Sequence, residues 1–143
     1  MAELPAETYD QIEELSEQGS FLFDRGDFRG AIDKWQRALA ALPPPATDWE
    51  AAMWLHSSIG DAYYQIALYP QARAALSEAL GAPGVLENPF VWYRLGQSEH
   101  QSGDLPAALE HLLRAYMLDG RGIFDADGEG QKYLDLLAEA SLI

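Results

Sequence analysis

Residues 94–120 read RLGQSEHQSGDLPAALEHLLRAYMLDG, and the small residues Gly96, Ala108 and Ala115 follow one another at intervals of twelve and seven positions. The same intervals occur twice earlier in the chain. The earlier sets are Gly19, Ala31 and Ala38, and then Gly60, Ala72 and Ala79. Successive glycines lie 41 and 36 residues apart, which indicates three copies of one supersecondary unit.

Each unit is predicted to be two antiparallel helices joined by a tight turn. The turns are seen in Arg25-Gly26-Asp27-Phe28 and in Ser102-Gly103-Asp104-Leu105. Larger apolar residues recur at helical spacing around the small ones, as Leu15, Leu22, Ile32, Trp35 and Leu39 do in the first unit. Small residues let two helix backbones approach closely, and no alternating run competes with this pattern. The fold class is therefore predicted to be all-α.

The repeated pattern resembles the tetratricopeptide repeat (TPR) family, whose unit has about 34 residues. The residues that carry the resemblance are Leu15, Gly19, Leu22, Ala31, Trp35, Ala38 and Pro43 in the first unit, Gly60, Tyr63, Ala72, Leu76 and Ala79 in the second, and Trp92, Leu95, Gly96, Ala108, Leu112 and Ala115 in the third. Glu99 stands where the family usually has an aromatic residue, and Gly120 stands where it has proline.

The resemblance predicts three TPR-like helix-turn-helix units over residues 12–45, 53–86 and 89–122, followed by a C-terminal capping helix over 128–142. The intervals of 41 and 36 residues imply insertions in the loops between units. The resemblance further implies seven helices in a right-handed superhelical stack, with residues 1–143 as a single TPR domain.

The charge balance restricts the kind of partner. The chain has 143 residues, with 23 Asp and Glu against 9 Lys and Arg, and its formal net charge is −14. A nucleic-acid-binding face needs clustered Lys and Arg, so this excess argues against nucleic acid. It also argues against docking on an anionic membrane. A basic protein partner is the expectation that fits the charge.

Several kinds of site and segment are excluded because the residues that they require are absent from the sequence. The chain has no cysteine, which excludes disulfides, thiolate metal sites and a cysteine nucleophile. The first residues contain neither a basic stretch nor an apolar core of a signal peptide. No run reaches the roughly 20 apolar residues of a membrane helix. A soluble cytoplasmic protein is therefore expected.

The partner-binding surface is predicted on the concave side of the stack, which the first helices of the units would form. Aromatic and polar residues that a helix pair does not need for its own packing are expected there. These residues are Glu17, Phe23, Trp54, Asp61, Tyr64, Phe90, Tyr93, Arg94 and Gln97. Trp54, Tyr64, Phe90 and Tyr93 are expected to be partly exposed, as anchors for a basic and partly apolar partner.

One TPR function can be tested on residues alone. TPR modules that clamp the C-terminal carboxylate of heat-shock chaperones use Lys, Asn and Arg on their first helices. The matching positions here carry Ser16, Ser20, Ser57, Tyr93 and Arg94. Only Arg94 agrees with such a site, so the sequence argues against a carboxylate clamp.

No catalytic or metal site is predicted, and no cofactor. His56, His100 and His111 form no i, i+4 pair, and no nucleophile or phosphate-binding motif occurs. The loop from Asp125 to Gly130 has glycine at the sixth position of a calcium loop, but the twelfth position is Leu136 instead of a bidentate Glu. This loop is therefore interpreted as a flexible, acidic break before the capping helix.

Two functions stay open, and both are those of a non-catalytic protein-interaction module. The size, acidity and layout of the chain resemble small bacterial TPR proteins that act as immunity proteins. That resemblance implies a cytoplasmic protein that neutralises a cognate secreted toxin through an acidic, aromatic-lined groove. The alternative is a chaperone or adaptor of a secretion or assembly system, which would bind a peptide or helix through the same groove.

Overall fold

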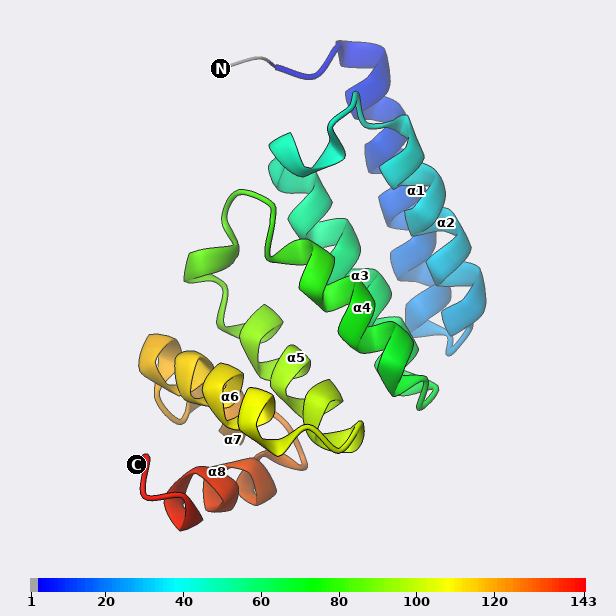
Figure 1. The fold of residues 1–143 in the computed structure, drawn as a ribbon. Coiled ribbons are helices and arrows are strands. Elements are labelled where there is room, and N and C mark those ends of the chain that lie inside the picture. Colours follow the sequence, from blue (N-terminus) through cyan, green and yellow to red (C-terminus); the bar gives the residue numbers. More distant parts are fainter. Residues whose placement is uncertain (1–2) are drawn as a thin grey trace. The chain divides into compact units, whose positions relative to one another are not determined.

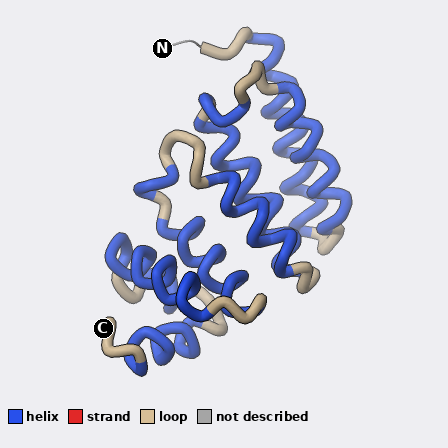
Figure 2. Tube along the Cα trace, in the orientation of Figure 1, coloured by secondary structure: helices blue, strands red, loops and turns tan. Residues whose placement is uncertain are grey.

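The computed structural model describes residues 3–143, and within this part of the chain every regular element is a helix (Figure 2). The prediction of an all-α fold is therefore confirmed. The chain divides into two compact units, Met1–Val85 and Leu86–Ile143. The superhelical path and the single-domain organisation stay predictions.

The first unit contains two helical hairpins (Figure 1). Their elements are α1 (Ala6–Asp24) and α2 (Phe28–Ala41), the short 3₁₀ helix η1 (Ala46–Asp48), and α3 (Glu50–Gln65) and α4 (Tyr69–Ala79). Helix α1 packs against α2, α2 against α3, and α3 against α4. The side chain of Asp27 caps α2 by accepting a hydrogen bond from the amide of Gly30 at 2.9 Å. These hairpins are the first two predicted repeats.

The second unit contains the third hairpin and a two-helix C-terminal segment (Figure 1). After the 3₁₀ helix η2 (Val85–Glu87) come α5 (Pro89–Gln101), α6 (Leu105–Asp119), α7 (Gly122–Asp125) and α8 (Gly130–Glu139). Asn88 caps α5 through the amide of Phe90, as its position before proline predicts. Helix α8 is the predicted capping helix. The four-residue α7 was not predicted, and it brings the described residues to eight α-helices instead of seven.

The repeated glycines lie where two helices of a hairpin cross. Each is buried inside the first helix of its hairpin, at Gly19, Gly60 and Gly96. A methyl group on Gly60 would lie 2.5 Å from Cγ of Leu76. The corresponding obstacles at the other two glycines are the indole of Trp35 and the side chain of Leu112. The partner alanines, Ala31, Ala72 and Ala108, are fully buried. The prediction of close mid-helix crossings is confirmed.

None of the helices in residues 3–143 combines the length and the apolar character that crossing a bilayer would require.

Candidate functional site

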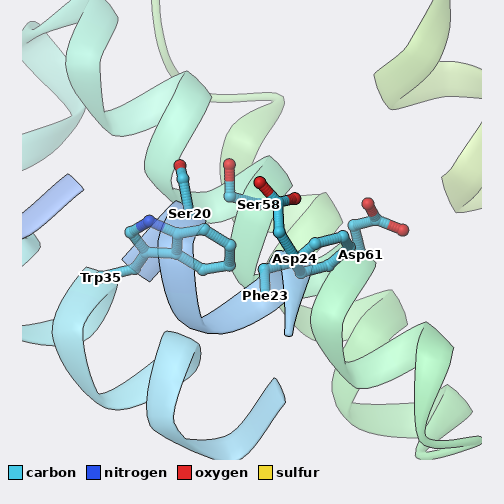
Figure 3. A pocket seen from close by; sticks show the side chains of 6 residues that line it. All are labelled: Ser20, Phe23, Asp24, Trp35, Ser58 and Asp61. Atoms are coloured by element: carbon cyan, nitrogen blue, oxygen red, sulfur yellow. The ribbon is translucent and has the colours of Figure 1, made fainter. Parts of the chain in front are cut away.

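Three helices of the first unit surround a pocket of about 190 Å³ (Figure 3). Its lining residues are Ser20, Phe23 and Asp24 from α1, Trp35 from α2, and Ser58 and Asp61 from α3. The pocket thus depends on both hairpins of this unit, since α3 begins the second one.

The aromatic side of the pocket is fixed by packing. Trp35 is only 5% exposed, and its Nε1 donates a hydrogen bond to the carbonyl of Ser16 at 3.2 Å. The indole can lie this close to α1 because Gly19 has no side chain at the point of contact. The ring of Phe23 lies 5.9 Å from that of Trp35, between centroids, and is itself met edge-on by Phe28. These contacts hold both aromatic rings in place.

The polar side of the pocket consists of two carboxylates and two hydroxyls. In Figure 3 the oxygen atoms of Ser20, Ser58 and Asp24 point to the same side of the pocket. Oδ1 of Asp61 accepts a hydrogen bond from Nε2 of Gln65 at 3.2 Å. The described residues that line the pocket include no Lys, Arg or His. Carboxylates beside aromatic faces attract a cation and repel an anion.

The charges of the first unit are segregated between its helices. Helices α1 and α3 carry eight Asp and Glu residues and no Lys or Arg. Helices α2 and α4 carry four Lys and Arg residues and two acids. The pocket takes its carboxylates from α1 and α3, so the negative charge around it extends along both helices.

In the first unit, the predicted site residues separate into two groups. Phe23 and Asp61 line the pocket. Trp54 and Glu17 do not, although both are exposed on the helices that form it, with Trp54 at 56%. Tyr64 is half-buried, and the ring of Tyr69 meets it edge-on at 5.4 Å. The expectation that Trp54 and Tyr64 are partly exposed is confirmed, and their role in binding stays a prediction.

In the second unit, the expectation of a partly exposed Tyr93 is wrong. Tyr93 is 1% exposed, and its hydroxyl donates a hydrogen bond to Oδ2 of Asp127 at 2.7 Å. The rings of Phe124 and Tyr133 meet its ring edge-on at 4.9 and 6.1 Å. The segment that contains α7 and α8 covers this face of α5, so Tyr93 is a core residue of the unit.

Gln97 is likewise buried, which corrects its assignment to a binding surface. It is 0% exposed, its Nε2 donates to Oδ2 of Asp127 at 2.9 Å, and its Oε1 accepts from Nη1 of Arg94 at 2.7 Å. The half-buried Arg94 guanidinium lies 5.1 Å above the ring of Phe90, which is also half-buried. Two predicted residues, Phe90 and Arg94, thus keep partial exposure in this unit.

The sequence predicts a flexible acidic break at the loop that contains Asp127. In the structure, Asp127 accepts hydrogen bonds from Tyr93 and Gln97 of α5. Burial alone would raise the pKa of Asp127, but the hydrogen bonds from Tyr93 and Gln97 hold that pKa below its ordinary value. Burial raises the pKa of the Tyr93 hydroxyl, and its bond to Asp127 adds to the increase. The pair is therefore a neutral phenol donating to an ionised carboxylate.

The three histidines lie in separate environments. Burial lowers the pKa of His56, with Glu78 opposing the change, and burial together with Lys132 lowers the pKa of His100. Nδ1 of His111 lies 2.6 Å from Oε1 of the buried Glu99. Among the residues that the structure describes, no group of three His, Asp or Glu side chains could hold a metal ion.

Three residues were not identified from the sequence. Ser58 and Trp35 line the pocket, and Asp127 accepts hydrogen bonds from Tyr93 and Gln97. Trp54, Ser58 and Asp61 lie at i, i+4 and i+7, so the helical period of that face could have identified Ser58. Trp35 was assigned to packing alone, and it serves both packing and the pocket wall. No sequence signal distinguishes Asp127 from the neighbouring acids of its loop.

Comparisons with known proteins agree with this architecture. Residues 58–126 match a family model described as tetratricopeptide repeat, and no curated protein matches the chain. The C-terminal TPR-containing domain of a putative FK506-binding protein from Plasmodium falciparum is 21% identical, with coverage of 94% of this chain and 93% of that chain and a TM-score of 0.75. The Arabidopsis OM64 TPR domain is 12% identical, with coverage of 93% of this chain and 98% of that chain and a TM-score of 0.73.

A third solved structure is the second TPR domain of human RPAP3 in complex with the HSP70 peptide SGPTIEEVD. It is 19% identical, with coverage of 90% of this chain and 95% of that chain and a TM-score of 0.71. The chain therefore has the fold of TPR domains, and residues 58–126 are similar to the tetratricopeptide repeat family model.

Proposed function

We propose that this chain is a non-catalytic protein-binding module and that its α1–α2–α3 pocket receives a basic side chain of the partner. The observation that carries the proposal is the composition of the pocket. Asp24 and Asp61 stand beside the rings of Trp35 and Phe23, and none of the pocket's described lining residues is basic. A volume of about 190 Å³ has room for one long side chain.

The physical preference for a cation has two sources. Two unit charges about 4 Å apart interact by roughly 4 kcal/mol at the effective dielectric constant of a protein surface, before desolvation is subtracted. A guanidinium or ammonium group near an aromatic face gains a further 0.5–1 kcal/mol or so at an exposed site. The eight acids of α1 and α3 extend the attractive field beyond the pocket and would steer a basic partner toward it.

The same composition disfavours the ligand seen in one structural neighbour. The human RPAP3 domain is solved with SGPTIEEVD, a peptide with two glutamates, an aspartate and a terminal carboxylate. Those groups would meet carboxylates of the same sign at Asp24 and Asp61. We therefore infer a partner segment of the opposite charge.

The proposal extends to the identity of the partner. We infer a cytoplasmic immunity protein that neutralises a basic toxin domain, which is supported by the net charge of −14 and by the acidic pocket. The second candidate is a chaperone or adaptor that binds an extended segment, and it is favoured by structural neighbours that were solved with peptides. An immunity protein would abolish the activity of one folded toxin, whereas a chaperone would bind an unfolded segment and release it.

The pocket is tested by titrating the full chain with two peptides and following amide and indole shifts by NMR. One peptide is capped at both ends and carries Arg and Lys among alanines, and the other is SGPTIEEVD. We expect saturable shifts at the pocket with the basic peptide only. The variant Asp24→Asn/Asp61→Asn should weaken that binding at least about threefold, on the scale of exposed ion pairs.

The matched control removes two charges from α1 outside the pocket, in Asp10→Asn/Glu13→Gln. Asp10 is 14 residues from Asp24, which is about 21 Å along a helix. Equal weakening in this control would show that only the net charge matters. Equal binding of the acidic peptide would overturn the assignment of the pocket. Purification of the partner from the native host, followed by an assay of that partner's activity, separates the immunity function from the chaperone function.

A further inference from the structure

A second cavity of the first unit has a different shape and different residues. We propose that the cavity between the beginning of α1, η1 and the beginning of α3 binds an aliphatic chain through its ammonium end. The cavity measures about 510 Å³, which is within the range of about 300–1,000 Å³ typical of ligand pockets. It shares no residue with the α1–α2–α3 pocket, so it is independent of the function proposed above.

The walls of this cavity are suited to an apolar chain. Leu4, Tyr9, Trp49 and Pro83 contribute most of its apolar side-chain groups. Trp49 is held in place, because its Nε1 donates to the carbonyl of Pro43 at 2.8 Å and its backbone amide donates to the carbonyl of Ala46 at 3.1 Å. Tyr9 is 54% exposed, so its ring gains little from the protein core in the absence of a ligand.

The charged groups of this cavity all have the same sign. Glu3, Asp48 and Glu50 line it, and no basic residue among the described lining residues opposes them. Within residues 3–143 none of these three carboxylates forms an ion pair. The segments that supply most of the lining, residues 3–9 and 48–51, contain four Asp and Glu and no Lys, Arg or His.

The combination selects one class of ligand. An anion would be repelled by three carboxylates, and a neutral apolar molecule would bury its surface without using their charge. A chain with an ammonium end satisfies both features, because its methylene groups contact the apolar walls while its charge meets the carboxylates and the aromatic faces. A free alkylamine and the lysine side chain of a protein share this chemistry.

The test compares three molecules of equal length by NMR titration of the full chain, following the four indole N–H signals. These are hexylammonium, 1-hexanol and hexanoate. We expect hexylammonium to bind at least about tenfold more tightly than 1-hexanol, which corresponds to about 1.4 kcal/mol, and hexanoate not to saturate. Equal affinity for hexylammonium and 1-hexanol would overturn the role of the carboxylates.

Two pairs of variants locate the binding. Tyr9→Ala should lower the affinity for hexylammonium at least threefold, whereas Phe21→Ala, on the same helix and similarly exposed at 56%, should leave it unchanged. Asp48→Asn/Glu50→Gln should lower it at least threefold. The control Glu13→Gln/Glu14→Gln removes the same amount of charge from α1, at two residues that do not line the cavity. Equal losses in a variant and its control would refute the site.

A further titration distinguishes the two sources of the ammonium group. The probe is Nα-acetyl-lysine N-methylamide, which carries the same charged chain on a peptide backbone. If it binds within about threefold of hexylammonium, the cavity admits a lysine of a partner protein. If only hexylammonium binds, the ligand is a free alkylamine. Either result supports the ammonium site, and failure of both probes overturns it.

Discussion

Replacement of Tyr93 by phenylalanine tests whether the hydrogen bond between α5 and the C-terminal segment stabilises the second unit. The hydroxyl of Tyr93 lies 2.7 Å from Oδ2 of Asp127, and the tyrosine is 1% exposed. Phenylalanine fills nearly the same volume, so the ring contacts with Phe124 and Tyr133 would remain. The substitution therefore removes one hydrogen bond with little change in packing.

The magnitude follows from the charge of the acceptor and its exposure. A hydrogen bond to a charged group contributes about 1.5–3 kcal/mol to stability. Asp127 is half-buried and still accepts from Gln97 at 2.9 Å, so water recovers part of the loss. We expect Tyr93→Phe to lower the free energy of unfolding by about 1–2 kcal/mol at neutral pH.

The effect should depend on pH in a defined direction. The folded-state pKa of Asp127 lies below its unfolded value, which is about 3.9 for an aspartate. The resulting stability is present above that unfolded pKa and is lost as the pH falls through the folded one. Protonated Asp127 is a weaker acceptor, so the difference between the wild type and Tyr93→Phe should shrink in acid.

The assay is urea denaturation followed by circular dichroism at pH of about 7 and about 2.5, which lie on either side of the unfolded pKa. Hydrogen exchange over residues 122–143 reports on the second unit specifically. The control is Tyr69→Phe on α4, because the described contacts of Tyr69 include a ring contact with Tyr64 and no hydrogen bond from its hydroxyl. It should change stability by less than about 0.5 kcal/mol.

A double-mutant cycle with Asp127→Asn separates the bond from its surroundings. The coupling energy between Tyr93→Phe and Asp127→Asn should be about 1 kcal/mol at neutral pH, within the range for residues in contact. Strictly additive losses, or an equal loss for Tyr93→Phe at both pH values, would refute the reasoning.

Three further predictions use separate measurements. Gly60→Ala should lower the free energy of unfolding by about 1–3 kcal/mol in urea denaturation, because its methyl group would lie 2.5 Å from Cγ of Leu76, and an unchanged midpoint would contradict this. Trp54→Ala should change the melting temperature little by calorimetry, since that side chain is 56% exposed, whereas Tyr93→Ala should cost about 3–5 kcal/mol by leaving a cavity. For a basic partner, raising the salt concentration to about 0.5 M should slow association in stopped-flow measurements more than it changes dissociation, and a salt-independent rate would limit the charge of −14 to a role in solubility.

Much of the fold could be predicted from the sequence because its requirements are local. The spacing from Gly96 to Ala108 and Ala115 reports a helix crossing that tolerates only small side chains, and Asn88 before proline marks a helix start. The short helix α7 escaped prediction because a four-residue element has no periodicity to detect.

The candidate site was predicted only in part, and Tyr93 shows why. The helical period identifies which residues share a face of α5, but it does not identify what covers that face. The covering segment lies about 30 residues away in the sequence, where Phe124, Asp127 and Tyr133 contact Tyr93. An aromatic residue at such a position is equally suited to a binding surface and to a core. Only the tertiary structure distinguishes the two.

In the pocket of the first unit, the residues that the fold requires differ from the residues proposed to bind the partner. Gly19 and Trp35 are buried against each other, so packing constrains them strongly. Asp24 is exposed and Asp61 half-buried, and a substitution at an exposed position usually changes stability by less than about 0.5 kcal/mol. The sign of the charge on Asp24 can therefore vary among proteins of this fold at little cost to the helices. For this reason, a shared fold with domains that bind acidic peptides does not predict an acidic ligand here, and the carboxylates of the pocket are the better guide to the partner.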